Sequence, residues 1–376
     1  MKSPPVQAGG EPADLSAAEA RALVVAAQFG GEPAKDSARV LRRLGLLQLD
    51  ALRRVDRAHR LTCLARMPAN ASVESVDGGL WSSGPARAFE TWVHAACLVP
   101  AEDWPLLRLA RAKTADRERK PDEAACAEVL AIVGGSEHGV TIREIEGAGP
   151  RTDGWEWSER KRAAEHLLWC GELICSERRG NRRVYDLPER RLPQSVLETE
   201  LSREAILETI ATRVLNATGV ATTQDVAVYY NLTTAEAAEG LASCGANPVT
   251  VQGWPTPAWT LQKDPPAHQL LPEARLIGPF DNLIWDRDRT RRVHDFDYSF
   301  EAYKPAHKRV YGHYVMGVLD THGRMLGRVD LRRQAGALEV IRSFAEPEVD
   351  EAHLAAGVAS AVAILTAQMK DVIPSS

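Results

Sequence analysis

The chain has 376 residues, enough for two or three domains, and its 44% hydrophobic and 26% charged composition is typical of a soluble globular protein. A formal charge of −5 excludes a polycation that coats nucleic acid indiscriminately, although it leaves room for a local basic groove. No apolar run is long enough for a membrane span. The six cysteines show neither a CxxC pair nor zinc spacing, so we expect a reduced, cytoplasmic protein with no metal and no other cofactor.

The N-terminal third begins with a polar segment, residues 1–14, which lacks the apolar centre of a signal peptide and is expected to be a disordered tail. Ser16 opens a capping box that predicts the first helix. A second helix is predicted over 37–45, ending at its glycine. Residues 46–50 are short and apolar enough for a strand, and 51–61 are expected to form a helix or turn.

Residues 121–195 have the order of a winged helix–turn–helix, which is three helices followed by a β-hairpin. The first helix is predicted to end at Gly134, the second is capped by Thr141, and the third runs over 158–171. Two alternating strands then surround a turn that contains Gly180.

The same order recurs in residues 196–265. A helix capped at Ser202, a short helix that starts near Thr222 and a third helix that ends at Gly245 precede a plausible hairpin. Together with an N-terminal unit over 15–120, this predicts three winged-helix units in tandem, with two units as the alternative.

Residues 266–376 have a different pattern, in which three alternating strands over 308–344 are separated by glycine turns and followed by a helix at about 348–370. This pattern predicts a small antiparallel sheet or a partly open barrel. The predicted fold class is therefore α+β, with tandem winged helix–turn–helix units and a C-terminal antiparallel β-domain.

Two segments are strongly basic: residues 39–66 hold eight Arg against two Asp, and 178–191 hold six Arg against one Asp and one Glu. A solvated surface is the simplest explanation for either segment alone. Two such segments together favour phosphate contacts, because a guanidinium is always charged and presents a planar fork of donors. The candidate DNA-binding residues are Arg53, Arg54, Lys161, Arg178, Arg179, Arg182 and Arg183, with Lys308 and Arg309 on the β-domain.

Within the first basic segment, an amide and a carboxylate, Gln48 and Asp50, interrupt a run of leucines. In a strand, Leu47 and Leu49 would face the core while Gln48 and Asp50 shared the opposite face and held a water between them. Alternatively, Asp50 caps a helix that begins at Ala51, and Gln48 bonds to the backbone. The spacing alone favours this second interpretation.

Several segments together resemble the YcaQ/AlkZ-type bacterial DNA glycosylases, a winged-helix family, over about residues 15–370. The segments that carry the resemblance are GLLQLDALRRVDRAHRL (45–61), FETWVHAACLVP (89–100), the helix and hairpin of 155–193, LIGPFDNLIWDRDRT (276–290) and FDYSFEAYKPAHKRVYGHYVMGVL (296–319). Asp50 places the chain in the YcaQ-like Gln-x-Asp branch and departs from the Gln-x-Gln signature of AlkZ, so no particular toxin is assigned.

The resemblance implies tandem winged helices and a β-domain curved around duplex DNA. It also implies base excision repair of N7-alkylated guanine, interstrand crosslinks included, and in some producers self-resistance to alkylating natural products. Gln48 and Asp50 would be catalytic. The near-site supports would be Arg57, His59, Glu90, Trp92 and His94.

The chemistry fits these residues, because N7 alkylation makes guanine a cationic leaving group and the remaining sugar is oxocarbenium-like. Asp50 can supply negative charge, and no Lys neighbours the motif in sequence, which predicts a monofunctional enzyme without a Schiff-base step. An open, concave site that works within the duplex suits a crosslinked base better than complete extrusion.

The supporting residues also have simpler interpretations. A helix over 87–98 would put Glu90 and His94 on one face, where a buried structural network is the stronger interpretation. Asp281 and Asn282 fit turn chemistry equally well. The alternative for the whole chain is a non-enzymatic winged-helix regulator. For the glycosylase, the expected partner is double-stranded DNA that carries alkylated guanine, bound by a monomer. We expect no contact with a membrane, and association with the nucleoid when the protein is bound to DNA.

Overall fold

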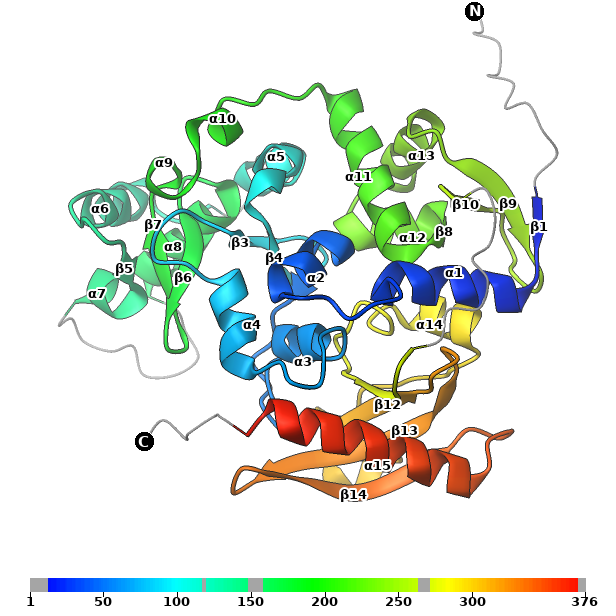
Figure 1. Ribbon diagram of the computed structural model, residues 1–376. Helices are drawn as coiled ribbons and strands as arrows, with labels where there is room; N and C mark the ends of the chain where they lie inside the picture. The colour runs from blue at the N-terminus through cyan, green and yellow to red at the C-terminus, as the bar shows by residue number, and fades with distance from the viewer. Residues whose placement is uncertain (1–12, 117–119, 148–157, 263–270, 371–376) are drawn as a thin grey trace, which may run out of the picture.

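The computed structural model describes residues 13–116, 120–147, 158–262 and 271–370, and the fold combines helices with four mainly antiparallel sheets (Figure 1). The N-terminal elements are β1 (Ala13–Leu15), α1 (Ala17–Phe29), α2 (Ser37–Leu44), β2 (Leu47–Gln48), α3 (Ala58–Leu64), α4 (Val73–Leu80), β3 (Ala88–Trp92), β4 (Ala96–Pro100), η1 (Ala101–Leu107) and α5 (Arg108–Ala115). Among the described residues, no helix is long and apolar enough to cross a membrane.

The middle of the chain contains two successive sets of helices, each followed by a hairpin. The first set is α6 (Glu123–Gly134), β5 (Val140–Thr141), α7 (Ile142–Glu146), α8 (Glu159–Cys170), β6 (Ile174–Arg179) and β7 (Arg182–Asp186), followed by α9 (Pro188–Arg191) and α10 (Gln194–Leu197). The second set is α11 (Arg203–Thr218), β8 (Val220–Thr222), α12 (Thr223–Tyr230), α13 (Thr234–Ser243), β9 (Asn247–Val251) and β10 (Ala258–Thr260). These sets confirm the predicted order of elements, whereas their division into domains remains a prediction.

The C-terminal part is an antiparallel sheet in the order β11-β12-β13-β14, packed against the last helix. Its elements are β11 (Arg275–Ile277), α14 (Arg287–His294), η2 (Ala306–Lys308), β12 (Val315–Leu319), β13 (Met325–Gln334), β14 (Ala337–Ala345) and α15 (Glu351–Gln368). The three predicted strands are confirmed as β12 to β14, and β11 adds a fourth.

Two expectations for the N-terminal part are wrong. Ala13 and Asp14 belong to β1, which pairs in parallel with β9, so they are not part of a tail; residues 1–12 lie outside the described residues. The segment 87–98 is a hairpin and not a helix, because β3 and β4 pair in register with Glu90 opposite Leu98. Phe89, Thr91 and Val99 have the aromatic and β-branched side chains that favour strands.

The strand that carries the interrupted apolar run is shorter than expected, since β2 comprises only two residues and no helix begins at Ala51. Its apolar residue and the leucine before it are buried, whereas Gln48 is only partly buried. Leu46 belongs to a core shared with α11 and α12, and Leu47 belongs to a second core shared with α2 to α4 and the C-terminal sheet. Figure 1 shows β2's neighbours, α2 and β4, at the centre of the molecule. Two cores therefore hold the strand that leads to Asp50.

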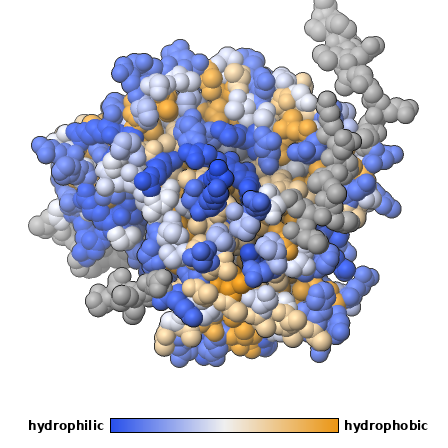
Figure 2. All heavy atoms as spheres, in the orientation of Figure 1, coloured by the Kyte–Doolittle hydropathy of each residue, from blue (hydrophilic) through white to orange (hydrophobic). Residues whose placement is uncertain are grey.

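The hydropathy of the surface differs between α2 and α15. Figure 2 shows strongly hydrophilic residues gathered where α2 lies in Figure 1, and paler, more hydrophobic residues along α15. The last turn of α2 carries Arg42 and Arg43. Two arginines of the first basic segment therefore belong to this helix, and one of them, Arg42, pairs with Glu102.

Candidate active site and nucleic-acid interface

Asp50 lies immediately after β2, at the point where the chain leaves the β2–β4 pairing. The backbone N–H of Leu49 still donates to the carbonyl of Ala96 at 2.8 Å, and the Oδ1 atom of Asp50 then accepts a 2.8 Å hydrogen bond from the N–H of Leu52. This bond closes a turn two residues long and does not cap a helix. Burial raises the pKa of the half-buried Asp50 carboxyl above its usual value, while the Leu52 hydrogen bond opposes that shift.

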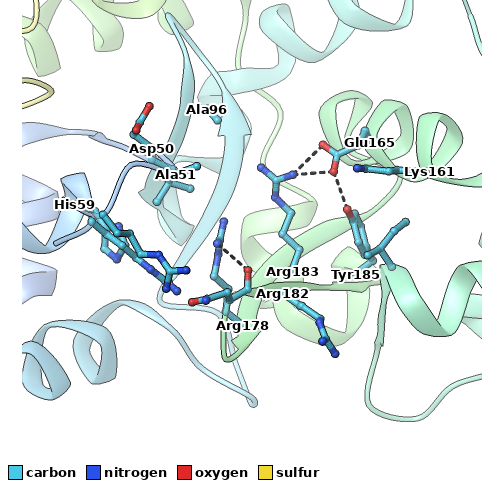
Figure 3. A pocket seen from close by; sticks show the side chains of 15 residues that line it. Asp50, Ala51, His59, Ala96, Lys161, Glu165, Arg178, Arg182, Arg183 and Tyr185 are labelled. Atoms are coloured by element: carbon cyan, nitrogen blue, oxygen red, sulfur yellow. Dashed lines mark hydrogen bonds and ion pairs between the residues drawn. The ribbon is translucent and has the colours of Figure 1, made fainter. Parts of the chain in front are cut away.

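A cavity of about 480 Å³ adjoins Asp50 and separates it from the β6–β7 hairpin. Figure 3 shows Asp50 and His59 on one side, Lys161, Glu165 and Tyr185 on the opposite side, and Arg178 between them. We call this space the Asp50 cavity. Its lining residues are Leu49, Asp50, Ala51, Arg53, Arg57, His59, Ala96, Ile142, Lys161, Glu165, Arg178, Asn181, Arg182, Arg183 and Tyr185.

The Asp50 cavity carries an excess of positive charge, with six cationic side chains against two carboxylates in its lining. Arg57 illustrates the effect: burial lowers the pKa of its guanidinium, and the nearby charges of Arg60 and Arg178 lower it further. Charged guanidiniums gathered around a concave space attract phosphate oxygens. The fold therefore brings side chains from both basic segments of the sequence to one cavity.

Glu90 fixes the wall that these cations form. Its buried carboxylate accepts hydrogen bonds from Nε of Arg178 and Nε of Arg183, each at 2.6 Å. These two cations lower the pKa of Glu90 to about 2, against the raising effect of burial. Arg183 also donates to Glu165, whose Oε1 accepts a 2.8 Å hydrogen bond from the hydroxyl of Tyr185. Glu90 thus ties β3 to the β6–β7 hairpin and supports the site without facing it.

Of the other predicted near-site residues, Trp92 lies at the surface and His59 is buried. Trp92 is 43% exposed and packs edge-on against Trp169 of α8. His59 lines the Asp50 cavity but is buried, with its Nε2 atom 3.5 Å from Oδ1 of Asp77 and its ring edge-on to Trp81. Burial lowers the pKa of His59, so its role at neutral pH is that of an uncharged packing group.

Four of the predicted DNA-binding residues do not line the Asp50 cavity. Arg54 is exposed and adjoins β13, since its carbonyl accepts from the N–H of Arg333. Arg179 is turned toward the carbonyl of His138. Lys308 is exposed in η2, and the Arg309 side chain donates to the carbonyl of Lys304. These four side chains lie on other surfaces, so the structure does not place them at the carboxylate.

Gln48 lies beside a different cavity, of about 730 Å³, which we call the Gln48 cavity. The Nε2 atom of His94 lies 3.3 Å from Oε1 of Gln48, and the imidazole stacks on Trp285 with ring centroids 3.9 Å apart and an interplanar angle of 8°. Burial lowers the pKa of His94 to about 4, so the ring is neutral at pH 7 and can donate from Nε2 to the amide oxygen. Gln48 and Asp50 therefore line two cavities, in place of the single shared face that a strand predicted.

The loop between β11 and α14 makes buried contacts at two residues for which the sequence analysis considered turn chemistry. Asp281 does accept from the N–H of Leu283, but its carboxylate also makes two 2.8 Å hydrogen bonds to the fully buried guanidinium of Arg66. Asn282 donates to the carbonyl of Leu46 at 3.0 Å. Trp285 completes the stack on His94. The apolar residues that follow Asp281 and Asn282 were the available sign that this loop is buried.

The described residues contain no group of three or more His, Cys, Asp or Glu side chains arranged to hold a metal ion.

Comparisons with known proteins identify the family and a similar fold. Residues 41–366 match the family described as DNA glycosylase AlkZ-like. Among solved structures, the Streptomyces sahachiroi DNA glycosylase AlkZ has a similar fold, with a TM-score of 0.60 and 19% sequence identity over 94% of this chain and 97% of that chain. At this identity the structural likeness concerns the fold alone, and it confirms a mixed helix and sheet architecture.

Proposed function

The chain belongs to the AlkZ-like family of DNA glycosylases, and from this membership we propose that it hydrolyses the N-glycosidic bond of N7-alkylated guanine in double-stranded DNA. The observation that carries the proposal is the position of Asp50, a half-buried carboxylate at the edge of a cavity lined by cationic side chains. Membership of a glycosylase family also favours an enzyme over the alternative of a winged-helix regulator that binds DNA without catalysis.

The cationic cavity explains how the substrate is held. Arg53, Arg57 and Arg182 line it together with Lys161, so the phosphates of a duplex strand would lie against this wall, with the deoxyribose close to Asp50. Such contacts give affinity and salt dependence and do not select a sequence. The selection of a lesion must then come from the reacting base and its surroundings.

The chemistry proceeds by loss of a leaving group that is already positively charged. The bond between C1′ and N9 breaks, its electron pair neutralises the alkylated purine, and the sugar becomes oxocarbenium-like. The carboxylate of Asp50 stabilises that positive charge, a water oxygen bonds to C1′, and the water's proton passes to the carboxylate or to solvent. Gln48, oriented by His94, contacts the same sugar–base junction from the neighbouring cavity.

We infer a monofunctional enzyme, in which water and not an amine attacks the sugar. The structure adds one group that the sequence did not place near the motif, since Lys161 of α8 lines the Asp50 cavity. Borohydride trapping on lesion DNA distinguishes the two mechanisms. We expect no covalent adduct; an adduct that disappears in Lys161→Arg would overturn the monofunctional mechanism.

The finer assignment includes interstrand crosslinks and a role in resistance to alkylating agents. An active site that is open along one side suits a base that remains tethered to the opposite strand. The protein would act as a monomer on duplex DNA. A panel of duplexes with methyl, mustard-monoadduct and mustard-crosslink lesions, compared by initial excision rates, tests this assignment. Equal inactivity on the crosslinked member would restrict the substrate to monoadducts.

The central experiment uses plasmid DNA treated with a methylating agent or a nitrogen mustard. We expect the protein to release alkylated guanine, and Asp50→Asn to lose nearly all of this activity while still binding the DNA. Asp288→Asn is the matched control, because Asp288 is exposed on α14 and does not line either cavity. Release by Asp50→Asn at the rate of the parent protein would overturn the proposed role of the carboxylate.

A further inference from the structure

The Gln48 cavity differs from the Asp50 cavity in one respect that bears on ligand choice, which is its charge. Its lining is formed by Gln48, His94, Ala95, Gln224, Ala227, Val228, Asn231, Leu232, Thr233, Thr234 and Trp285. None of these described residues carries an ionised side chain at pH 7, because the pKa of His94 is lowered to about 4. A volume of about 730 Å³ falls within the range of small-molecule sites.

The wall of this cavity is aromatic and amide-bearing. The stacked rings of His94 and Trp285 provide a flat surface, and the amide of Gln48 is fixed against it by the 3.3 Å contact with His94. Gln224, exposed on α12, also lines the cavity, and its amide oxygen is 3.5 Å from the hydroxyl of Thr234. Flat rings and amides are the groups with which proteins stack and hydrogen-bond nucleobases.

The two cavities meet the chain two residues apart, at Gln48 and Asp50. A cationic base is repelled by the six cationic side chains of the Asp50 cavity, whereas phosphates are attracted there. The neutral Gln48 cavity does not repel a cationic base. A sugar placed at residues 48–50 would therefore direct its phosphates to one cavity and its base to the other.

We propose that the Gln48 cavity is the binding site for the positively charged N7-alkylguanine base, an inference that rests on the proposed function for the identity of the base. The cavity discriminates by charge: it accepts the cation because it lacks competing cations, and it offers amide groups to the polar edge of guanine. Its outer side is formed by exposed residues, Gln224, Asn231, Thr233 and Thr234. The alkyl substituent, or the tether of a crosslink, passes out over this side.

The test uses nucleosides and no DNA, so that it does not depend on excision. The probes are 7-methylguanosine, which is cationic, and guanosine, which is its neutral counterpart, titrated into the intact protein by calorimetry. We expect the parent protein to bind 7-methylguanosine more tightly than guanosine. Gln224→Arg and Gln224→Glu give the charge test, because Gln224 is exposed and neither change disturbs the core. Arg should weaken, and Glu strengthen, binding of the cationic probe by about threefold or more, with little effect on guanosine.

The same two substitutions at Gln194, exposed on α10 and outside both cavities, are the matched control and should leave binding unchanged. Equal binding of both nucleosides, or no response to the charge at position 224, overturns the inference. Excision of alkylguanine by the parent protein is measured in parallel. Excision without charge-selective binding would reject this site and keep the proposed function, whereas selective binding without excision would reject the function and keep the site.

Discussion

The side-chain amide of Asn282 donates a 3.0 Å hydrogen bond to the backbone carbonyl of Leu46, which lies 236 positions earlier in the chain. The same amide donates at 2.7 Å to the hydroxyl of Tyr229, which in turn donates at 2.8 Å to the carbonyl of Leu44. Two carbonyls immediately before β2 are therefore held by residues from distant parts of the chain. These hydrogen bonds hold the backbone that leads into β2 and thereby fix the positions of Gln48 and Asp50.

Replacement of Asn282 with Ala should lower the free energy of unfolding by about 1–3 kcal/mol, because the buried carbonyl of Leu46 loses its partner. Urea denaturation measures the loss. The excision rate at saturating DNA should fall in the same variant, since β2 is no longer held, while the affinity for DNA is kept. Asn247→Ala, at an exposed position of β9, is the control and should change neither quantity. An unchanged rate in a destabilised protein would show that these hydrogen bonds are structural only.

Because of the Glu90 carboxylate, the free energy of unfolding should depend on pH in the acidic range. Its folded pKa of about 2 lies below the ordinary value of 4.5, so its stabilisation is fully present above pH 4.5 and is lost as the pH falls through about 2. Glu90→Gln should remove this dependence and take from Arg178 and Arg183 the carboxylate that they share, with Arg183 keeping only Glu165, at a cost of about 3–5 kcal/mol in the free energy of unfolding.

Unfolding followed by circular dichroism between pH 2 and pH 7 compares this variant with the parent protein. Glu128→Gln is the control, because Glu128 pairs with Arg160 on the exposed surface and its loss should have a small effect. Parallel pH profiles for the parent protein and Glu90→Gln would contradict the assigned ion pairs.

Local signals in the sequence predicted much of this fold. The capping boxes at Ser16 and Thr141 locate their helices because both partners are three residues apart, and the glycine turns separate the C-terminal strands for an equally local reason. The helix expected over 87–98 was wrong because Glu90 and His94 match the helical spacing by coincidence, while the β3–β4 hairpin depends on pairing with β2 and on contact of β3 with β6.

The candidate site shows the same limit. The basic segments and Asp50 were recognisable as residue types, and the fold brings five of the fourteen arginines of these segments to the cavity beside Asp50. No local pattern could show that Gln48 faces a second cavity, because that depends on the stack of His94 with Trp285, which is 191 positions away. Asn282 was missed for the same reason: its partners are carbonyls, which leave no trace in a sequence.

Excision should depend on pH through Asp50, because only its ionised form stabilises the cationic sugar. Burial raises the pKa of this carboxyl above 3.8, so the excision rate should fall with decreasing pH at a midpoint above that value. Single-turnover rates on lesion duplexes measure this limb, after subtraction of the spontaneous depurination of the same DNA. Residual excision by Asp50→Asn should lack the limb. A parent rate that stays level down to pH 3.8 would exclude Asp50 as the titrating group.

Salt dependence tests the phosphate contacts of the Asp50 cavity, and Arg182 is the suitable residue because it is exposed and lines that cavity. Arg182→Ala should weaken DNA binding and lower the slope of log K against log salt concentration by about 1, since one phosphate contact is lost. The excision rate at saturating DNA should be kept. Arg203→Ala provides the matched control, because Arg203 is exposed on α11 and pairs with Glu239 away from the cavity. Identical slopes for the two variants and the parent protein would place the duplex on another surface.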